Sequence, residues 1–242
     1  MQERVKTSPK VLAITVSCIA LALAALASTV LLGVENYYLV SVAIAVLTMV
    51  PFFATFESRK PQARDLVILA VVIALAIVSR AAFFWFPDFK PIAAVIIIAG
   101  IAFGPQAGFM TGAMSMLLSN FLFGQGPWTP WQMLAFGLAG LVFGILSQKN
   151  LIPHKDYTKK QVLLLTVGGL FFTWCVIGPL LDVCALFLMA NDYTVESVLA
   201  IFASGVPVNF TRAVATALLL FFATNPLLDK LERVKVKYGM GE

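Results

Sequence analysis

Charged residues within apolar stretches are the first candidates for chemistry in this sequence. Arg80, Asp182 and Arg212 each lie inside a long run of apolar residues. A charge at membrane depth costs about 2.5–3.5 kcal/mol on insertion scales, so each of these residues needs a partner or a ligand. Asn209 lies three residues before Arg212 and shares its helical face. Asp182, Asn209 and Arg212 therefore predict either a structural ion pair between two helices or part of a small-molecule site.

Arg80 allows two interpretations. It follows Ala74 by six residues, a rotation of about 240° on a helix, so it faces away from the small-residue stripe formed by Ala70 and Ala74. Either it contributes to a binding site, or its long side chain reaches the membrane interface near the aromatic residues 83–85.

A rigid aromatic turn supplies further candidates. Residues 124–132 read Gly-Gln-Gly-Pro-Trp-Thr-Pro-Trp-Gln, and the prolines stiffen the turn. Asn120, just before it, shares a helical face with Gly112 and needs hydrogen-bond partners. Tryptophans at such a place serve as interfacial anchors or as pocket walls. The residues expected to gather at one rim are Asn120, Gln125, Trp128, Trp131 and Gln132.

The composition requires these side chains to be positioned by membrane-spanning helices. The chain has 242 residues, of which 60% are hydrophobic and 12% charged, unlike soluble domains. Its apolar stretches are continuous rather than alternating, which favours helices over a barrel. The predicted fold is an all-α, polytopic membrane helix bundle. With ~20 apolar residues per crossing, spans are expected at 11–32, 37–56, 65–86, 91–104, 106–123, 131–148, 161–190 and 206–224.

The positive charges predict the orientation of this bundle. Every Lys and Arg except Arg80, Lys90 and Arg212 falls in a segment that is cytoplasmic if both termini are cytoplasmic. A cleaved signal peptide is the alternative for the first span, because Ala25-Leu26-Ala27 precedes Ser28 after a basic start and an apolar run. Pro207 is expected in the first turn of the last span, and residues 194–204 are expected to form a separate short helix over the outer mouth.

Other features indicate packing rather than chemistry. Gly108 with Gly112, and Gly140 with Gly144, have the four-residue spacing of closely packed membrane helices. The cysteines lack metal-type spacing, His154 is isolated, and no catalytic or nucleotide-binding motif occurs. We therefore expect no enzyme, no metal or other cofactor and no nucleic-acid partner; the partners expected from composition are the lipid bilayer and a small molecule.

From about Leu66 onward, the chain resembles the substrate-binding S components of energy-coupling factor (ECF) vitamin transporters. The resemblance rests on Ala70-x-x-x-Ala74, on residues 104–108 (Gly-Pro-Gln-Ala-Gly) and on residues 207–212 (Pro-Val-Asn-Phe-Thr-Arg). It implies a six-helix core at 61–242, preceded by two extra transmembrane helices at 1–60. It also implies docking of Ala70 and Ala74 to a transmembrane scaffold subunit that carries two ATPases. Pocket roles are implied for three connections: 87–90, 124–132 and 191–205. The first of these contains Lys90.

The ligand remains open at this level. Residues 120–132 look most like members associated with corrinoid uptake, which makes cobalamin the leading ligand and a smaller vitamin or nucleobase-like precursor the second. Two other classes compete. One is a self-sufficient proton-coupled transporter in which Asp182 titrates, and the other is a structural or assembly subunit without a ligand.

Overall fold

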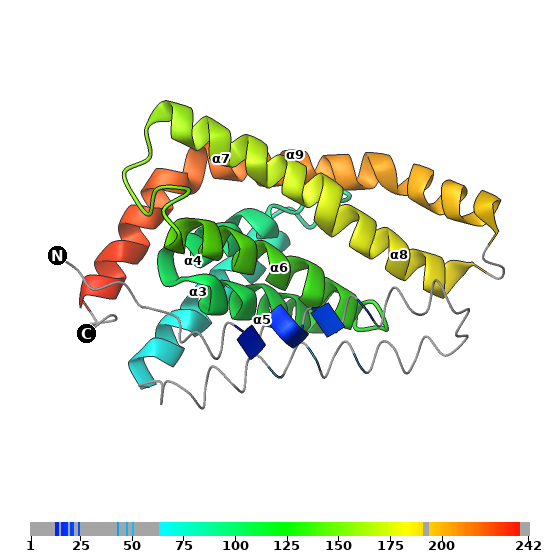
Figure 1. The fold of residues 1–242 in the computed structure, drawn as a ribbon, viewed down its shortest axis with the longest axis horizontal. Coiled ribbons are helices and arrows are strands. Elements are labelled where there is room, and N and C mark those ends of the chain that lie inside the picture. The colour runs from blue at the N-terminus through cyan, green and yellow to red at the C-terminus, as the bar shows by residue number, and fades with distance from the viewer. Residues whose placement is uncertain are drawn as a thin grey trace.

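The computed structural model describes residues 63–190 and 194–237, together with scattered positions between 13 and 50. The expected spans 11–32 and 37–56 and the proposed cleavage site thus lie largely outside the described residues. The described ranges form a helical bundle (Figure 1), which confirms the predicted fold class. The helices are α3 (Ala63–Ala81), α4 (Ile92–Phe103), α5 (Pro105–Phe123), α6 (Thr129–Gln148), α7 (Lys159–Phe172), η1 (Thr173–Ile177), α8 (Gly178–Met189) and α9 (Val195–Lys237).

Helix α4 is the centre of the bundle. All of its residues are buried, as expected for a helix that is apolar on every side. It packs against α3, α5, α6 and α9. At 12 residues it is about 18 Å long, and Gly104, with φ 91°, ends it before Pro105 starts α5. Its last carbonyls are satisfied from other helices, because Ser147 donates to Ile101 O at 3.4 Å and Lys235 donates to Ala102 O at 3.3 Å.

Glycines bring α4, α5 and α6 into backbone contact. A Cβ on Gly140 would lie 2.8 Å from the Gly108 Cα, and one on Gly112 would lie 2.7 Å from the Gly137 nitrogen. A Cβ on Gly144 would meet the backbone of Pro105. The packing role expected for Gly108, Gly112, Gly140 and Gly144 is therefore confirmed.

Helices α7, η1 and α8 form one continuous rod that lies beside α9 (Figure 1). The rod contains a π-helical segment at Thr173–Ile177. Pro179 follows this segment; it has no N–H to donate, and its ring crowds the carbonyl four residues earlier. Together with α6, this rod and α9 are long and apolar enough to cross a membrane, whereas the apolar stretches of α3 and α4 are shorter.

Two expectations about the helix ends are wrong. Helix α3 stops at Ala81, and turns follow it where the sequence predicted helix to residue 86. Pro207 lies inside α9, which begins at Val195, so residues 194–204 form no separate helix. The predicted span 206–224 covers only the middle of α9. The prediction began the helix near Pro207 because proline favours the first turn of a helix. A membrane helix can also contain a proline in its interior.

Candidate functional site

The connections 82–91 and 124–128 lie at the end of the bundle that the charge pattern predicts to face outward. We call this end, with the neighbouring turns of α3, α5, α6, α8 and α9, the outer end. Most of the predicted site residues lie here, in two hydrogen-bonded groups. One group is centred on Asn120 and the other on Asn209.

The Asn120 group joins α3, α5 and α6. Arg80 donates from Nη1 to Ser119 Oγ at 2.5 Å and to Asn120 Oδ1 at 2.9 Å. Its guanidinium also lies 4.6 Å from the centre of the Phe123 ring, a cation–π distance. Arg80 therefore turns toward α5, where the Phe123 ring under its guanidinium packs against Phe84 with ring centres 5.7 Å apart. This position agrees with the predicted separation of Arg80 from Ala70 and Ala74.

Asn120 continues this group into α6. It is buried, and its Nδ2 donates to Thr129 Oγ1 at 2.9 Å and to Gln132 Oε1 at 2.8 Å. Thr129 in turn donates to Gln125 Oε1 at 2.8 Å, and Gln125 Nε2 donates to Leu117 O at 2.9 Å. The aromatic turn is thus held to α5 by a chain of amides. Ser119 and Thr129 were not predicted, because single hydroxyl residues in membrane helices carry little signal.

The two tryptophans of the turn have different environments. Trp128 is 39% exposed, and its ring covers Gly126. Trp131 is only 3% exposed and packs against Phe187 with ring centres 5.7 Å apart. The structure does not bring Trp131 to the rim with Trp128: Trp128 caps the start of α6 and is partly exposed, whereas Trp131 lies within the helix and is buried against Phe187.

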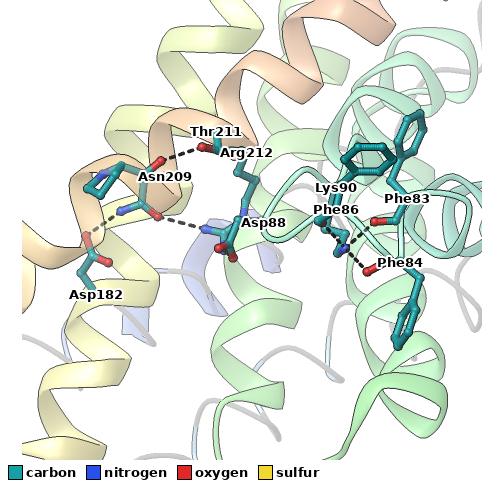
Figure 2. A network of polar contacts seen from close by, with 10 residues as sticks. Phe83, Phe84, Phe86, Asp88, Lys90, Asp182, Asn209, Thr211 and Arg212 are labelled. Carbon is teal, nitrogen blue, oxygen red and sulfur yellow. Dashed lines mark hydrogen bonds and ion pairs between the residues drawn. The ribbon is translucent and has the colours of Figure 1, made fainter.

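The Asn209 group joins α8 and α9 (Figure 2). Asn209 donates from Nδ2 to Asp182 Oδ2 at 2.7 Å and accepts from Arg212 Nη1 at 2.9 Å. Its amide therefore bridges the two charges, and the direct ion pair considered from the sequence is not formed. Glycines make room for the group: a Cβ on Gly178 would lie 2.7 Å from Asn209 Cγ, and one on Gly205 would lie 2.6 Å from Asp182 Cγ.

Asp88 is the partner of Arg212 that the sequence analysis missed. Its Oδ1 lies 3.9 Å from Arg212 Nη2 (Figure 2). The residue has φ 57°, in the left-handed region where Asp is tolerated. The sequence could have indicated this pair, because Asp88 is an acidic residue in an outer connection and Arg212 is a basic residue in the outer half of a helix.

Lys90 has a local structural role in the same connection. Its ammonium donates to the carbonyls of Phe83, Phe84 and Phe86 at 2.6, 3.2 and 2.8 Å (Figure 2). Burial lowers the pKa of Lys90, and the nearby carboxylate of Asp88 partly offsets this decrease. Because an ammonium has three donors and all three are engaged, Lys90 shapes the 82–91 connection and is not placed to bind a ligand here.

The predicted docking residues lie on the opposite side of α3 from its core contacts. Ala70 and Ala74 are exposed, as are Val67, Val71 and Val78, whereas Ala76 is fully buried. An exposed stripe of small and β-branched residues leaves this face of α3 accessible within the described part of the chain.

Comparison with known proteins matches residues 60–228 to the family described as "ECF-type riboflavin transporter, S component". The UPF0397 protein of Streptococcus gordonii is 32% identical over 130 residues, 52% of this chain and 67% of that protein. The UPF0397 protein of Lactobacillus helveticus is 29% identical over 124 residues, 50% of this chain and 65% of the relative. The chain thus spans about two thirds of the length of these curated relatives. No solved structure matches it significantly.

The matched residues include α3 to α8, most of α9, and both polar groups at the outer end. This match confirms the resemblance to ECF S components, whereas the corrinoid ligand stays a prediction. An S component is a transporter subunit and not a class of enzyme. The chain therefore belongs to the family of ECF-type riboflavin transporter S components and is a substrate-binding membrane subunit of this type.

Proposed function

We propose that the chain captures a vitamin-like molecule at its outer end and delivers it inward with an ECF scaffold subunit and two ATPase subunits. The observation that carries the proposal is the pair of polar groups around Asn120 and Asn209. Polar side chains at membrane depth are costly and usually mark a substrate path. Their convergence on one end of a bundle that belongs to a transporter family supports a binding site there.

Riboflavin is the leading ligand of this proposal. The family description names it, and the outer end combines exposed aromatic side chains with amides. Trp85 and Trp128 are 85% and 39% exposed, and rings of this kind can cover a flat heterocycle while amides orient its polar edge. We propose that Trp128, Gln125, Gln132 and Asn209 contact the ligand.

A corrinoid such as cobalamin is the second candidate, supported by the resemblance of residues 120–132. The burial of Trp131 weakens it, because only part of the expected tryptophan-lined mouth is then open to a large ligand. A matched binding experiment separates the two candidates, since they differ several-fold in size and share no ring system.

Docking through α3 completes the proposal. The exposure of Ala70 and Ala74 supports contact with a scaffold subunit, because small residues let membrane helices approach closely. The ligand-binding groups contact other faces, so capture and docking would use separate surfaces.

The proposal is tested with the full chain in lipid nanodiscs. Isothermal titration with riboflavin and with cobalamin is combined with mass spectrometry of small molecules that co-purify. We expect Trp128→Ala and Asn209→Ala to weaken binding about tenfold or more, by loss of a stacking or hydrogen-bonding partner. Phe222→Ala serves as the aromatic control, because Phe222 is exposed and lies further along α9, toward its C-terminal end. Absence of any bound molecule would contradict the proposal.

The competing proton-coupled transporter is tested in the same lipids. If Asp182 coupled transport to protons, the chain alone would accumulate the ligand in liposomes under a pH gradient. We expect accumulation only when the scaffold, the ATPases and ATP are present.

A further inference from the structure

The contacts of Arg80 leave its charge unbalanced. Its hydrogen bonds go to the neutral acceptors Ser119 and Asn120. Among the ion pairs of the described residues, none includes Arg80. A half-buried guanidinium without a carboxylate is unfavourable unless something else neutralises it. The environment of Arg80 therefore favours the binding of an anion.

Arg80 and Arg212 also keep unused donors. A guanidinium has five N–H groups, but both residues form their hydrogen bonds through Nη1 only. Neither guanidinium contributes to the polar atoms that are sealed in the described structure without a partner. Each guanidinium thus keeps N–H groups that form no hydrogen bond within the described structure.

The counter-ion of Arg212 is weakly held. Asp88 lies 3.9 Å from Arg212 Nη2, and its side chain is 43% exposed whereas that of Arg212 is 16% exposed. This distance is longer than a charge-assisted hydrogen bond. Asp88 belongs to a connection outside the helices, so it can leave Arg212 without disturbing the bundle. Its carboxylate occupies a place that another oxyanion could take.

The two arginines lie at the same outer end. Arg80 is in the last turn of α3, and Asp88, in the connection that follows α3, lies 3.9 Å from Arg212 Nη2. Asp182 also faces Arg212 but is held by Asn209 on the other side of the amide. Lys90 is occupied by backbone carbonyls. Of the cations described at the outer end, Arg80 and Arg212 thus keep N–H groups without a hydrogen-bond partner.

We propose that Arg80 and Arg212 together bind an oxyanion of the transported molecule, a phosphate or a carboxylate, which displaces Asp88 from Arg212. The inference rests on the proposed function and refines its ligand: the transported molecule carries an acidic group, as riboflavin 5′-phosphate does and riboflavin does not. Arginine suits this role because its planar donors match the oxygens of both anions.

The test compares two probes that differ only in an oxyanion, riboflavin and riboflavin 5′-phosphate, by isothermal titration with the full chain in nanodiscs. We expect the phosphorylated probe to bind about tenfold or more tightly than riboflavin, as for a charge-assisted contact. Arg80→Gln and Arg212→Gln should each abolish this preference. The exposed Arg233 at the opposite end of α9 provides the matched control, Arg233→Gln, which should keep it.

Asp88→Asn tests the displacement with an effect of the opposite sign. Removing the resident carboxylate should tighten binding of riboflavin 5′-phosphate severalfold and leave that of riboflavin unchanged. A variant that only damaged the fold would weaken both. Equal affinity for the two probes in the native chain, or a preference that survives in both arginine variants, would overturn the inference while leaving vitamin binding intact.

If neither probe binds, the co-purified molecule decides. A retained molecule with a phosphate or carboxylate that is lost from Arg80→Gln supports the inference, and a retained molecule without an acidic group overturns it. If the chain retains nothing and binds neither these probes nor cobalamin, the proposed function fails, and the inference fails with it.

Discussion

The α5–α6 contact and the α8–α9 contact both depend on glycines, but the glycines admit different groups. Gly140 receives the backbone of Gly108, so the contact between α5 and α6 is made of main-chain atoms. Gly205 receives the Asp182 side chain, and Gly178 receives that of Asn209. Each of α8 and α9 therefore supplies one glycine and one polar side chain to the other.

This difference separates two uses of the same residue. Backbone contact leaves no adjustable atom, so it fixes the distance between α5 and α6. A side chain can change rotamer or be displaced, so the α8–α9 contact holds a polar group at membrane depth and can still adapt. We therefore expect rigidity in the first region and ligand-dependent adjustment in the second.

The largest expected effect is that of Gly140→Ala. Its methyl group would overlap the backbone of Gly108, and the helices would have to separate, at a cost of about 3 kcal/mol. The measurement is the free energy of unfolding in detergent by denaturant titration. Gly168→Ala is the matched control, because its Cβ would meet only Phe143 at 3.9 Å. Equal losses in the two variants would show that backbone contact is not what matters.

A smaller and reversible effect is expected for Gly205→Ala. The added methyl group would collide with the Asp182 carboxylate, at a cost of about 2 kcal/mol. Shortening the opposing side chain should relieve the collision, so Gly205→Ala combined with Asp182→Ala should cost less than the sum of the single changes by about 1 kcal/mol. A double-mutant cycle of unfolding free energies measures this coupling. Strict additivity would contradict the interlocked arrangement.

Thr129→Val should have a still smaller effect. The change keeps the shape but removes the hydroxyl that accepts from Asn120 and donates to Gln125, so the expected loss of stability is about 1 kcal/mol. Thr211→Val is the control, because Thr211 bonds only to Pro207 O of its own helix. If both variants unfold alike, the amide chain does not stabilise the aromatic turn.

The smallest change in stability is expected for Ala74→Leu. Ala74 is exposed, so the larger side chain should alter the free energy of unfolding by no more than about 0.5 kcal/mol. Riboflavin binding should persist, whereas ATP-dependent uptake with the scaffold and ATPases should be lost. Loss of binding in Ala74→Leu would contradict the separation of the docking and capture surfaces.

The sequence predicted what periodicity and apolar length determine. The short α4, the glycine pairs of α5 and α6, and the orientation of Arg80 away from Ala74 all follow from helical repeats. Asp88 was missed because its contact with Arg212 joins a turn to a helix distant in sequence. The prediction that Pro207 starts a helix was wrong. The preference of proline for a first helical turn was overridden by the packing of a continuous α9 along α7 and α8.

The complete burial of α4 has a consequence for hydrogen exchange. An amide in a helix covered on every side exchanges with solvent only when neighbouring helices separate, so its protection reports the opening of the whole bundle. Amides of α4 should therefore be the last to take up deuterium, and ligand added to the native chain should slow them further only if it stabilises the entire bundle. The exchange rates of the α4 amides thus distinguish a ligand that stabilises the whole bundle from one that changes only the outer end.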